Sequence, residues 1–228
     1  MAAEFLVVFA LYPRVTQLDF TGPHEVLARL PGAKCILASS VGGTIEADGG
    51  IVFAGVRRLS DIEHCELICV PGGFGTIEAM EDQEMLAQLR RLASGARYVT
   101  SVCTGALVLG AAGLLRGRRA TSHWAWRDAL SAFGAIPDPS RVVRDGNVFT
   151  GGGVTAGIDF ALTVMAEAAG DDYARSVQLS IEYAPAPPFD SGRPDLAPSH
   201  VLAATQQRYE RVRRARDEAI ARAAARLG

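Results

Sequence analysis

A cysteine at the junction of a strand and a helix carries the strongest chemical signal in the sequence. Residues 97–102 form an apolar, strand-like run that ends at Cys103, and residues 104–115 have the composition of a helix. Gly105 leaves room for a tight turn between them, which is the geometry of a nucleophile elbow with sulfur in place of a serine oxygen. The dipole of the helix should favour the reactive thiolate. We therefore predict that Cys103 is a nucleophile, with a buried structural cysteine as the alternative.

Attack by a thiolate builds negative charge, which hydrogen-bond donors must balance. The backbone amide of Thr104, directly after the nucleophile, is one candidate donor. The other is an amide of Gly72 or Gly73, in the Pro-Gly-Gly turn that follows residues 67–70. The Thr104 hydroxyl is also placed to bind a substrate or an intermediate. The structural alternatives are an ordinary strand-ending turn for the two glycines and a helix cap for Thr104.

Asp19 is the candidate acid–base group. It lies between Leu18 and Phe20, and partial desolvation by these apolar neighbours would raise the pKa of its carboxyl into a useful range. A helix-capping aspartate is the alternative interpretation. None of the four histidines adjoins the cysteine; His123 is within possible reach of the site, but a structural role explains it better. His64 lies beside two cysteines, yet Cys69 belongs to a buried strand, so we expect no metal site.

Apolar runs alternate with helical patterns along the whole chain, and this alternation predicts an α/β fold. We predict strands at 5–10, 35–39, 67–70, 97–102 and 118–122, hairpins at 44–54 and 141–150, and helices at 82–94, 104–115, 124–133, 155–168, 173–183 and 197–227. A further helix should run to Leu30, with Thr21 as its cap and Pro23 in its first turn. Such chains form a mostly parallel sheet covered by helices on both faces, and ligands bind at the carboxyl ends of its strands. That edge should bring together Asp19, Gly72 and Gly73, Cys103, and Gly151–Gly153.

Composition narrows the class of protein. The chain has 228 residues, of which 49% are hydrophobic and 21% charged, and a net charge of −2, so we expect one domain over 1–228 with a C-terminal helical extension at 197–227. The near-neutral charge predicts binding neither to nucleic acid nor to a membrane. Lys34 is the only lysine, which disfavours Schiff-base and P-loop chemistry. Four cysteines without a C-x-x-C pair indicate reduced thiols, as expected of a cytoplasmic protein.

Six segments together resemble the ThiJ/PfpI superfamily, and the resemblance covers nearly the whole chain. They are Leu18 to Leu27 (LDFTGPHEVL), Val70 to Gly73 (VPGG), Ser101 to Leu115 (SVCTGALVLGAAGLL), Gly117 to Thr121 with His123 and Trp124, Gly151 to Phe160 (GGGVTAGIDF), and Glu182 to Phe189 (EYAPAPPF). The cysteine segment indicates only the superfamily. Asp19 and the Pro-rich segment point, within it, to the isocyanide hydratase family.

This resemblance implies a flavodoxin-like fold, related to class I glutamine amidotransferases, and an activity that hydrates an isocyanide to an N-substituted formamide. By position, Cys103 corresponds to the nucleophile, Asp19 to the acid–base carboxylate, and Thr104 to a residue needed for activity. The amides of Gly73 and Thr104 would face the reacting atoms. The resemblance further implies a covalent thioimidate intermediate, a homodimer, and no metal or organic cofactor.

Two other readings stay open. One is another cysteine hydrolase, a deglycase-like protein or a redox sensor of the same superfamily, although peptidase and glyoxalase-like members resemble Cys-His where this chain has Cys103-Thr104. The other is a transcription regulator of the AraC type, which carries a similar domain followed by a helix-turn-helix region. Here a single predicted helix follows Phe189, without a strongly basic face, so DNA binding is not expected.

Overall fold

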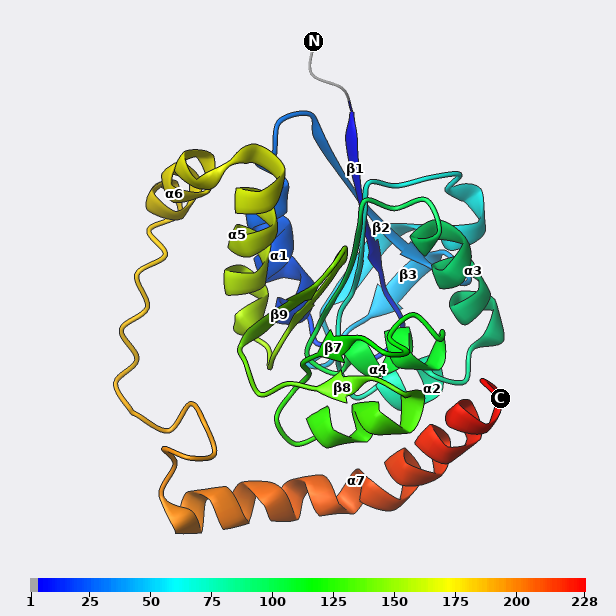
Figure 1. Cartoon of the computed structure of the whole chain (residues 1–228), viewed down its shortest axis with the longest axis vertical. Coiled ribbons are helices and arrows are strands. Elements are labelled where there is room, and N and C mark those ends of the chain that lie inside the picture. Colours follow the sequence, from blue (N-terminus) through cyan, green and yellow to red (C-terminus); the bar gives the residue numbers. More distant parts are fainter. Residues whose placement is uncertain (1–3) are drawn as a thin grey trace.

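The sheet runs through the centre of the molecule (Figure 1). The structure is a computed structural model that describes residues 4–228. Within them, eight strands pair in the order β3-β4-β2-β1-β5-β6-β10-β9. The strands are β1 (Phe5–Ala10), β2 (Ala33–Ser39), β3 (Gly43–Glu46), β4 (Val52–Arg58), β5 (Leu67–Val70), β6 (Tyr98–Val102), β9 (Val142–Asp145) and β10 (Val148–Gly151). Pairing is parallel from β4 through β10, and the hairpin strands β3 and β9 add antiparallel edges.

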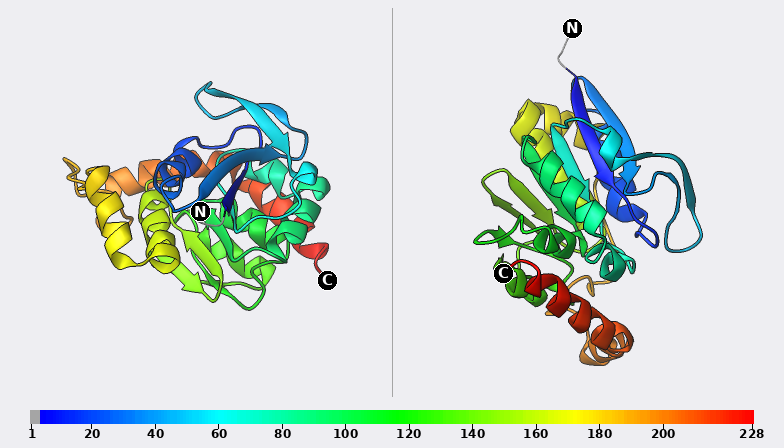
Figure 2. Two further views of the ribbon diagram at one scale, coloured as in Figure 1. Left: turned by 90° about the horizontal axis from the view of Figure 1, so that it is seen from above. Right: turned by 90° about the vertical axis from the view of Figure 1, so that its right-hand side faces the viewer.

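Helices cover both faces of this sheet, as predicted (Figures 1 and 2). They are α1 (Leu18–Leu27), α2 (Thr76–Ala79), α3 (Gln83–Ala93), α4 (Gly105–Ala111), α5 (Ala156–Ala169), α6 (Asp171–Ser180) and α7 (Ser199–Ala225). Helices α1 and α5 pack together on one face, and α3 and α4 cover the other. Two short strands, β7 (Arg119–Ala120) and β8 (Ile136–Pro137), pair separately. The fold is therefore the α/β sandwich that the alternating pattern predicts.

The central strands form the core because both of their faces are covered. All four residues of β5 and the last four of β1 have no exposed surface, and these strands read as continuous apolar runs. Strands at the sheet margin are different: in β4 only Val56 is buried. Buried parallel strands fix the positions of the loops at their carboxyl ends, where a site would form.

Three predicted helices differ from those observed. Helix α1 begins at Leu18, before the predicted cap Thr21, whose amide and hydroxyl both donate to the carbonyl of Gln17. Asp19 therefore lies in the first turn of the helix instead of ahead of it. Helix α4 ends at Ala111, because Gly113 adopts a left-handed φ of 76° that ends a helix before the predicted stop at 117.

The third difference follows the short strand β7. Residues 124–133 were predicted as an α-helix and form a turn followed by a 3₁₀ helix at Arg127–Phe133. The predicted strand at 118–122 shortens to Arg119–Ala120, since the chain leaves the sheet region and pairs only with β8. Both changes leave 121–126 as irregular backbone, which approaches the carboxyl edge of the sheet from one side.

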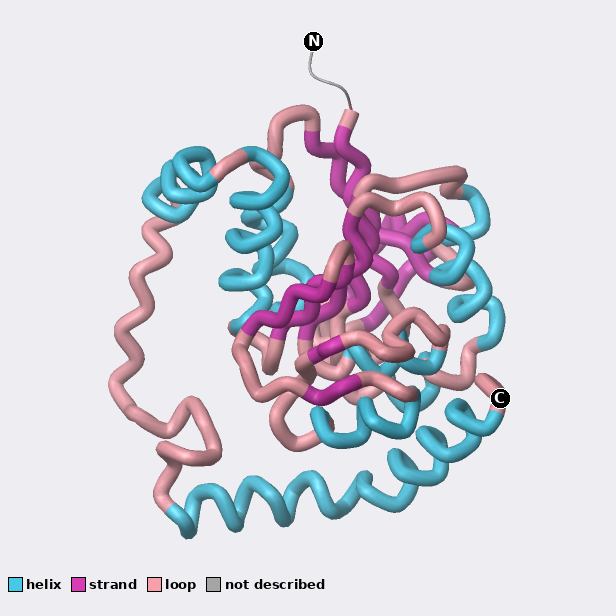
Figure 3. The backbone as a smooth tube through the Cα atoms, viewed as in Figure 1, coloured by secondary structure: helices cyan, strands magenta, loops and turns pink. Residues whose placement is uncertain are grey.

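Helix α7 crosses the carboxyl edge of the sheet after a long extended connection, residues 181–198 (Figures 1 and 3). Its last turns are anchored by the buried Ala219, Ile220 and Ala223, and by an ion pair from Arg222 to Glu81 at 2.6 Å. Its first turns are largely exposed. Within residues 4–228, no helix combines the length and apolar character that spanning a membrane requires.

Candidate active site

Cys103 adopts the strained backbone of a nucleophile elbow. Its φ is 57°, a left-handed value that is rare outside glycine. Its amide donates to the carbonyls of Gly151 (3.0 Å) and Gly152 (2.8 Å), and its own carbonyl accepts from the Ser122 hydroxyl (2.8 Å). A Cβ at Gly105 would overlap the carbonyl at the end of β5, so the turn requires glycine there. These contacts from β10, β5 and the β7 loop hold the strained turn in place.

Asp19 lies beside this turn with its carboxyl fully buried. Its Oδ2 accepts from the amide of Gly72 at 2.9 Å, and Oδ1 has no hydrogen-bond partner among the described residues. Burial raises the pKa of Asp19 to about 7, and interactions with the Cys103 thiol and the Gly72 amide offset part of the rise. The carboxyl is desolvated as predicted, and it bonds to another segment instead of capping its own helix.

Burial and nearby charge both act on the Cys103 thiol. Burial raises its pKa well above the usual range, and the negative charge of Asp19 raises it further. The amides of Val154 and Thr104 bond to the sulfur and act in the opposite direction. Burial thus acts against the thiolate that the dipole of the short helix α4 is expected to favour. An ionised Asp19 near pH 7 is instead suited to accept the thiol proton during attack.

Thr104 belongs to a buried hydroxyl network. Its Oγ1 accepts from the amide of Gly73 (3.1 Å) and shares a 2.7 Å hydrogen bond with the Thr76 hydroxyl, which in turn lies 3.0 Å from the hydroxyl of Tyr12. Tyr12 donates to the carbonyl of Pro71 at 2.6 Å. The Thr104 side chain makes no capping bond to α4. Its hydroxyl thus ties the cysteine turn to the Pro-Gly-Gly turn.

The two glycine amides orient side chains in this structure. Gly72 donates to Asp19, and Gly73 donates to Thr104, so the predicted Gly73 donor is directed at the threonine and not at open space. A Cβ at Gly72 would lie 2.6 Å from the Thr104 nitrogen and 2.8 Å from Asp19 Oδ2. Glycine at this position lets the carboxylate and the cysteine turn approach each other closely. At the sulfur, the amides of Thr104 and Val154 are the donors.

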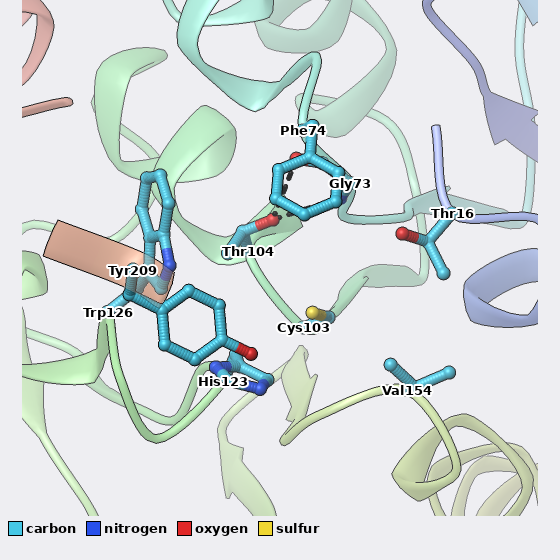
Figure 4. A pocket seen from close by; sticks show the side chains of 9 residues that line it. All are labelled: Thr16, Gly73, Phe74, Cys103, Thr104, His123, Trp126, Val154 and Tyr209. Atoms are coloured by element: carbon cyan, nitrogen blue, oxygen red, sulfur yellow. Dashed lines mark hydrogen bonds between the residues drawn. The ribbon is translucent and has the colours of Figure 1, made fainter. Parts of the chain in front are cut away.

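A cavity of 180 Å³ opens in front of the Cys103 sulfur (Figure 4). Four of its nine lining residues are aromatic, and they come from three separate segments: Phe74, His123, Trp126 and Tyr209. Burial lowers the pKa of His123 to about 4, so its ring is neutral near pH 7. The cavity therefore offers a reactive sulfur at one end and an uncharged, aromatic surface around it.

Comparison with known proteins places this site in a family. Residues 6–167 match the profile of the DJ-1/PfpI family. The chain belongs to this family. It is 53% identical to isonitrile hydratase from Pseudomonas putida over 96% of both chains. A ThiJ/PfpI family protein from Pseudomonas syringae has a crystal structure that superposes with a TM-score of 0.91 at 40% identity, covering 97% of this chain and 91% of that one.

A transcription regulator matches over a smaller part of its length. The HTH-type transcriptional regulator GlxA from Rhizobium meliloti is 32% identical over 76% of this chain, and the match spans 55% of the regulator. Similarity to the hydratase, in contrast, extends through the C-terminal helix. The resemblance to the ThiJ/PfpI superfamily and to its hydratase branch, expected from sequence motifs, is thus confirmed.

The family site unites the residues predicted from the sequence and adds others. Asp19, Gly72, Gly73, Cys103 and Thr104 meet at the carboxyl edge of the sheet, together with the glycines after β10. His123, for which a structural role seemed the better explanation, lines the cavity and also packs against its neighbours Trp124 and Tyr209.

Two contributors were missed. They are Trp126 and Tyr209, which line the cavity together with Val154. A lone aromatic residue within the charged first half of the C-terminal helix was the one available signal for Tyr209. Among residues 4–228, no group of His, Cys, Asp and Glu side chains is arranged to hold a metal ion. Burial raises the pKa of Cys65 and Cys69 to about 12, and neither thiol lines the cavity.

Proposed function

We propose that this protein hydrates isocyanides, R–N≡C, to N-substituted formamides, R–NH–CHO. The observation that carries the proposal is the Asp19–Cys103 pair, buried at the base of an uncharged cavity, in a chain that is 53% identical to an isonitrile hydratase over nearly its whole length. Isocyanides are neutral and their terminal carbon accepts nucleophiles. A nucleophile with an adjacent base in an uncharged pocket suits such a substrate.

In the first step, the Cys103 sulfur attacks the terminal carbon of the isocyanide. Asp19 accepts the thiol proton as the S–C bond forms, and this proton is then transferred to the same carbon. The product is a covalent thioimidate, R–N=CH–S, attached to the enzyme. A carboxyl with a pKa of about 7 exchanges protons readily near neutral pH, which is what a group that first accepts and then donates requires.

In the second step, water adds to the thioimidate carbon. Asp19 accepts one proton from the water and passes it to the imine nitrogen, giving a tetrahedral adduct that carries OH, S and NH–R on the same carbon. Collapse breaks the C–S bond, releases the formamide and returns the proton to sulfur. The amides of Thr104 and Val154 support the departing sulfur, and the Thr104 hydroxyl keeps the cysteine turn aligned with Gly73.

The direct test is turnover of phenyl isocyanide by purified protein, followed by formamide absorbance and by the mass of the intact protein. Cys103→Ala should abolish turnover, and Cys35→Ala, at a half-buried thiol outside the cavity, should retain it. Asp19→Asn should remove turnover while Cys103 is still present. Formamide production by the Cys103→Ala variant would refute covalent catalysis. No turnover by a wild-type protein whose Cys103 still alkylates would shift the proposal to a redox role.

We propose that the protein acts as a homodimer in which a second copy covers the extended connection. Large apolar side chains are exposed on α6 and along this connection: Leu179 is 82% exposed, Phe189 79% and Leu196 51%. An isolated chain seldom exposes such a series without a partner. Light scattering after gel filtration should give two chains per particle, and Phe189→Asp should shift it to one. A wild-type monomer at micromolar concentration would contradict this proposal.

Within that assembly, we propose that residues 1–228 act as one domain whose extension at 197–227 completes the cavity through Tyr209. We also propose a cytoplasmic location. All four cysteines are unpaired, which is the state that a reducing compartment maintains. Immunodetection in cytoplasmic and periplasmic fractions of the source cells would test the location, and recovery in the periplasmic fraction would refute it.

A further inference from the structure

Tyr209 is the part of the cavity wall that comes from the C-terminal helix. Its ring packs edge-on against Trp124, with ring centroids 5.7 Å apart, and against His123 at 5.5 Å. Figure 4 shows its hydroxyl end directed toward the space in front of Cys103. Burial raises the pKa of this hydroxyl, so it stays neutral at all working pH values.

A second hollow, here called the outer hollow, also has Tyr209 in its lining. It measures 470 Å³ and is lined by Gln206, Glu210, Arg213 and Arg216 of α7, together with Trp124 and Ala125. Tyr209 belongs to the lining of both hollows. The inner one is uncharged and reaches Cys103, whereas the outer one carries paired charges, including Arg213 with Glu210 at 3.1 Å.

We propose that Tyr209 is a specificity-determining partition, which limits the substrate to a neutral isocyanide with one compact ring by closing the cavity of Cys103 against the charged hollow behind it. This inference rests on the proposed function and deepens it. It assigns the first half of α7 a role in the choice of substrate. The contacts with His123 and Trp124 hold the ring in that position.

The size of the inner cavity supports a single ring. A cavity of about 150 Å³ is enough to hold benzene, so 180 Å³ accommodates one phenyl or cyclohexyl group with little to spare. On the proposed partition, a chain attached opposite the isocyanide group would have to pass the Tyr209 ring. An ionised group would meet the neutral His123 and the other aromatic rings, and it would lose its hydration without gaining a partner.

Truncating the ring should therefore join the two hollows. In Tyr209→Ala the wall between them is lost, and an extended substituent can reach the larger outer space. Tyr209→Phe keeps the ring and removes only the hydroxyl, so it should keep the partition. Arg214→Ala is the matched control on the same helix, because this side chain is 93% exposed and lines neither hollow.

The experiment compares phenyl isocyanide with para-butylphenyl isocyanide in the full-length protein. We expect Tyr209→Ala to raise the ratio of kcat/KM for the extended over the compact substrate by about tenfold or more, the scale at which hydrophobic pockets discriminate size. Tyr209→Phe and Arg214→Ala should keep the wild-type ratio. A Tyr209→Ala ratio equal to that of the wild type would overturn the partition. Should that variant not fold by circular dichroism, Tyr209→Leu takes its place.

A second readout separates this inference from the proposed function. The rates at which N-phenyl iodoacetamide and its para-butyl analogue alkylate Cys103 give the same size comparison without any hydration. Wild-type protein that turns over neither isocyanide would refute the proposed function alone. The partition would still stand if Tyr209→Ala relieves the discrimination between the two iodoacetamides, and it would fall if the alkylation ratio does not change.

Discussion

Replacing Asp19 with asparagine should stabilise the fold above neutral pH while it removes activity. The asparagine has nearly the same shape, and its carbonyl oxygen can accept the Gly72 amide as Oδ2 now does at 2.9 Å. It cannot ionise. The carboxylate of Asp19, in contrast, must exist at pH 8 in a place without exposed surface. The substitution therefore tests whether the carboxylate of Asp19 is ionised while it is buried away from water.

The magnitude follows from the shift of the Asp19 pKa from 3.8 to about 7. Because the folded value is raised, the folded state binds the proton more tightly. Stability is complete below about pH 4, falls as the pH rises toward 7, and stays lower above it. The pKa shift of about 3 units corresponds to a loss of about 4 kcal/mol in the free energy of unfolding at high pH. About one third of this loss has already occurred at pH 5. Asparagine has no such dependence.

The measurement is urea unfolding of wild type and Asp19→Asn at pH 5 and pH 8. The asparagine NH₂ replaces an atom without a hydrogen-bond partner, at a cost of about 1–3 kcal/mol at either pH. Because this cost is the same at both pH values, it cancels when the effect of the substitution at pH 5 is subtracted from its effect at pH 8. From pH 5 to pH 8, we expect the free energy of unfolding of the variant to rise by about 3 kcal/mol relative to that of the wild type. The exposed Asp172→Asn should gain nothing. If the free energies of unfolding of Asp19→Asn and wild type change in parallel with pH, Asp19 does not carry a buried charge.

Other perturbations probe the same turn. In the wild type, kcat/KM should rise with pH through about 7, because only ionised Asp19 accepts the thiol proton; a flat profile between pH 5 and 8 would contradict this role. Thr104→Val should lower kcat/KM by about tenfold or more, whereas Thr104→Ser should retain most of it; equal losses would argue against the hydroxyl. Gly72→Ala should displace the carboxylate and reduce turnover, since its Cβ would lie 2.8 Å from Asp19 Oδ2; unchanged turnover would show that the turn relaxes freely. Gly105→Ala should cost at least about 3 kcal/mol in urea unfolding, because its Cβ would overlap the carbonyl at the end of β5.

The residues at the ends of buried strands were predictable from the sequence. Strands β1 and β5 have the predicted bounds, because apolar runs with glycine or proline after them leave little freedom in a parallel sheet. Cys103 follows β6 directly, and Gly72 lies two positions after the end of β5. Asp19 was found by its apolar neighbours, although its helix begins earlier than Thr21 and Pro23 suggested. Local pattern therefore located Cys103, Gly72 and Asp19, each from its immediate neighbours in the sequence.

The charge state of the site was beyond such reasoning. Helix α4 begins beside Cys103, and the dipole argument predicted a thiolate from that local fact alone. Burial of the sulfur and the proximity of Asp19 depend on the packing of β5, β6 and α1 against one another, and both act against ionisation. The two buried acids compete for negative charge, so their states are a property of the pair and not of either sequence segment.

The wall of the cavity depends on contacts between residues that lie still farther apart in the sequence. Tyr209 reaches Cys103 only because the extended connection at 181–198 returns α7 across the carboxyl edge of the sheet, and because Ala219, Ile220 and Ala223 anchor its end. The proposed nucleophile thus follows β6 directly and its proposed acid–base partner lies in α1, while part of the cavity wall belongs to the extension. Chains that share the Cys103–Asp19 chemistry can then differ in substrate through a few positions on one exposed helix, at little cost to the core that holds the reactive pair.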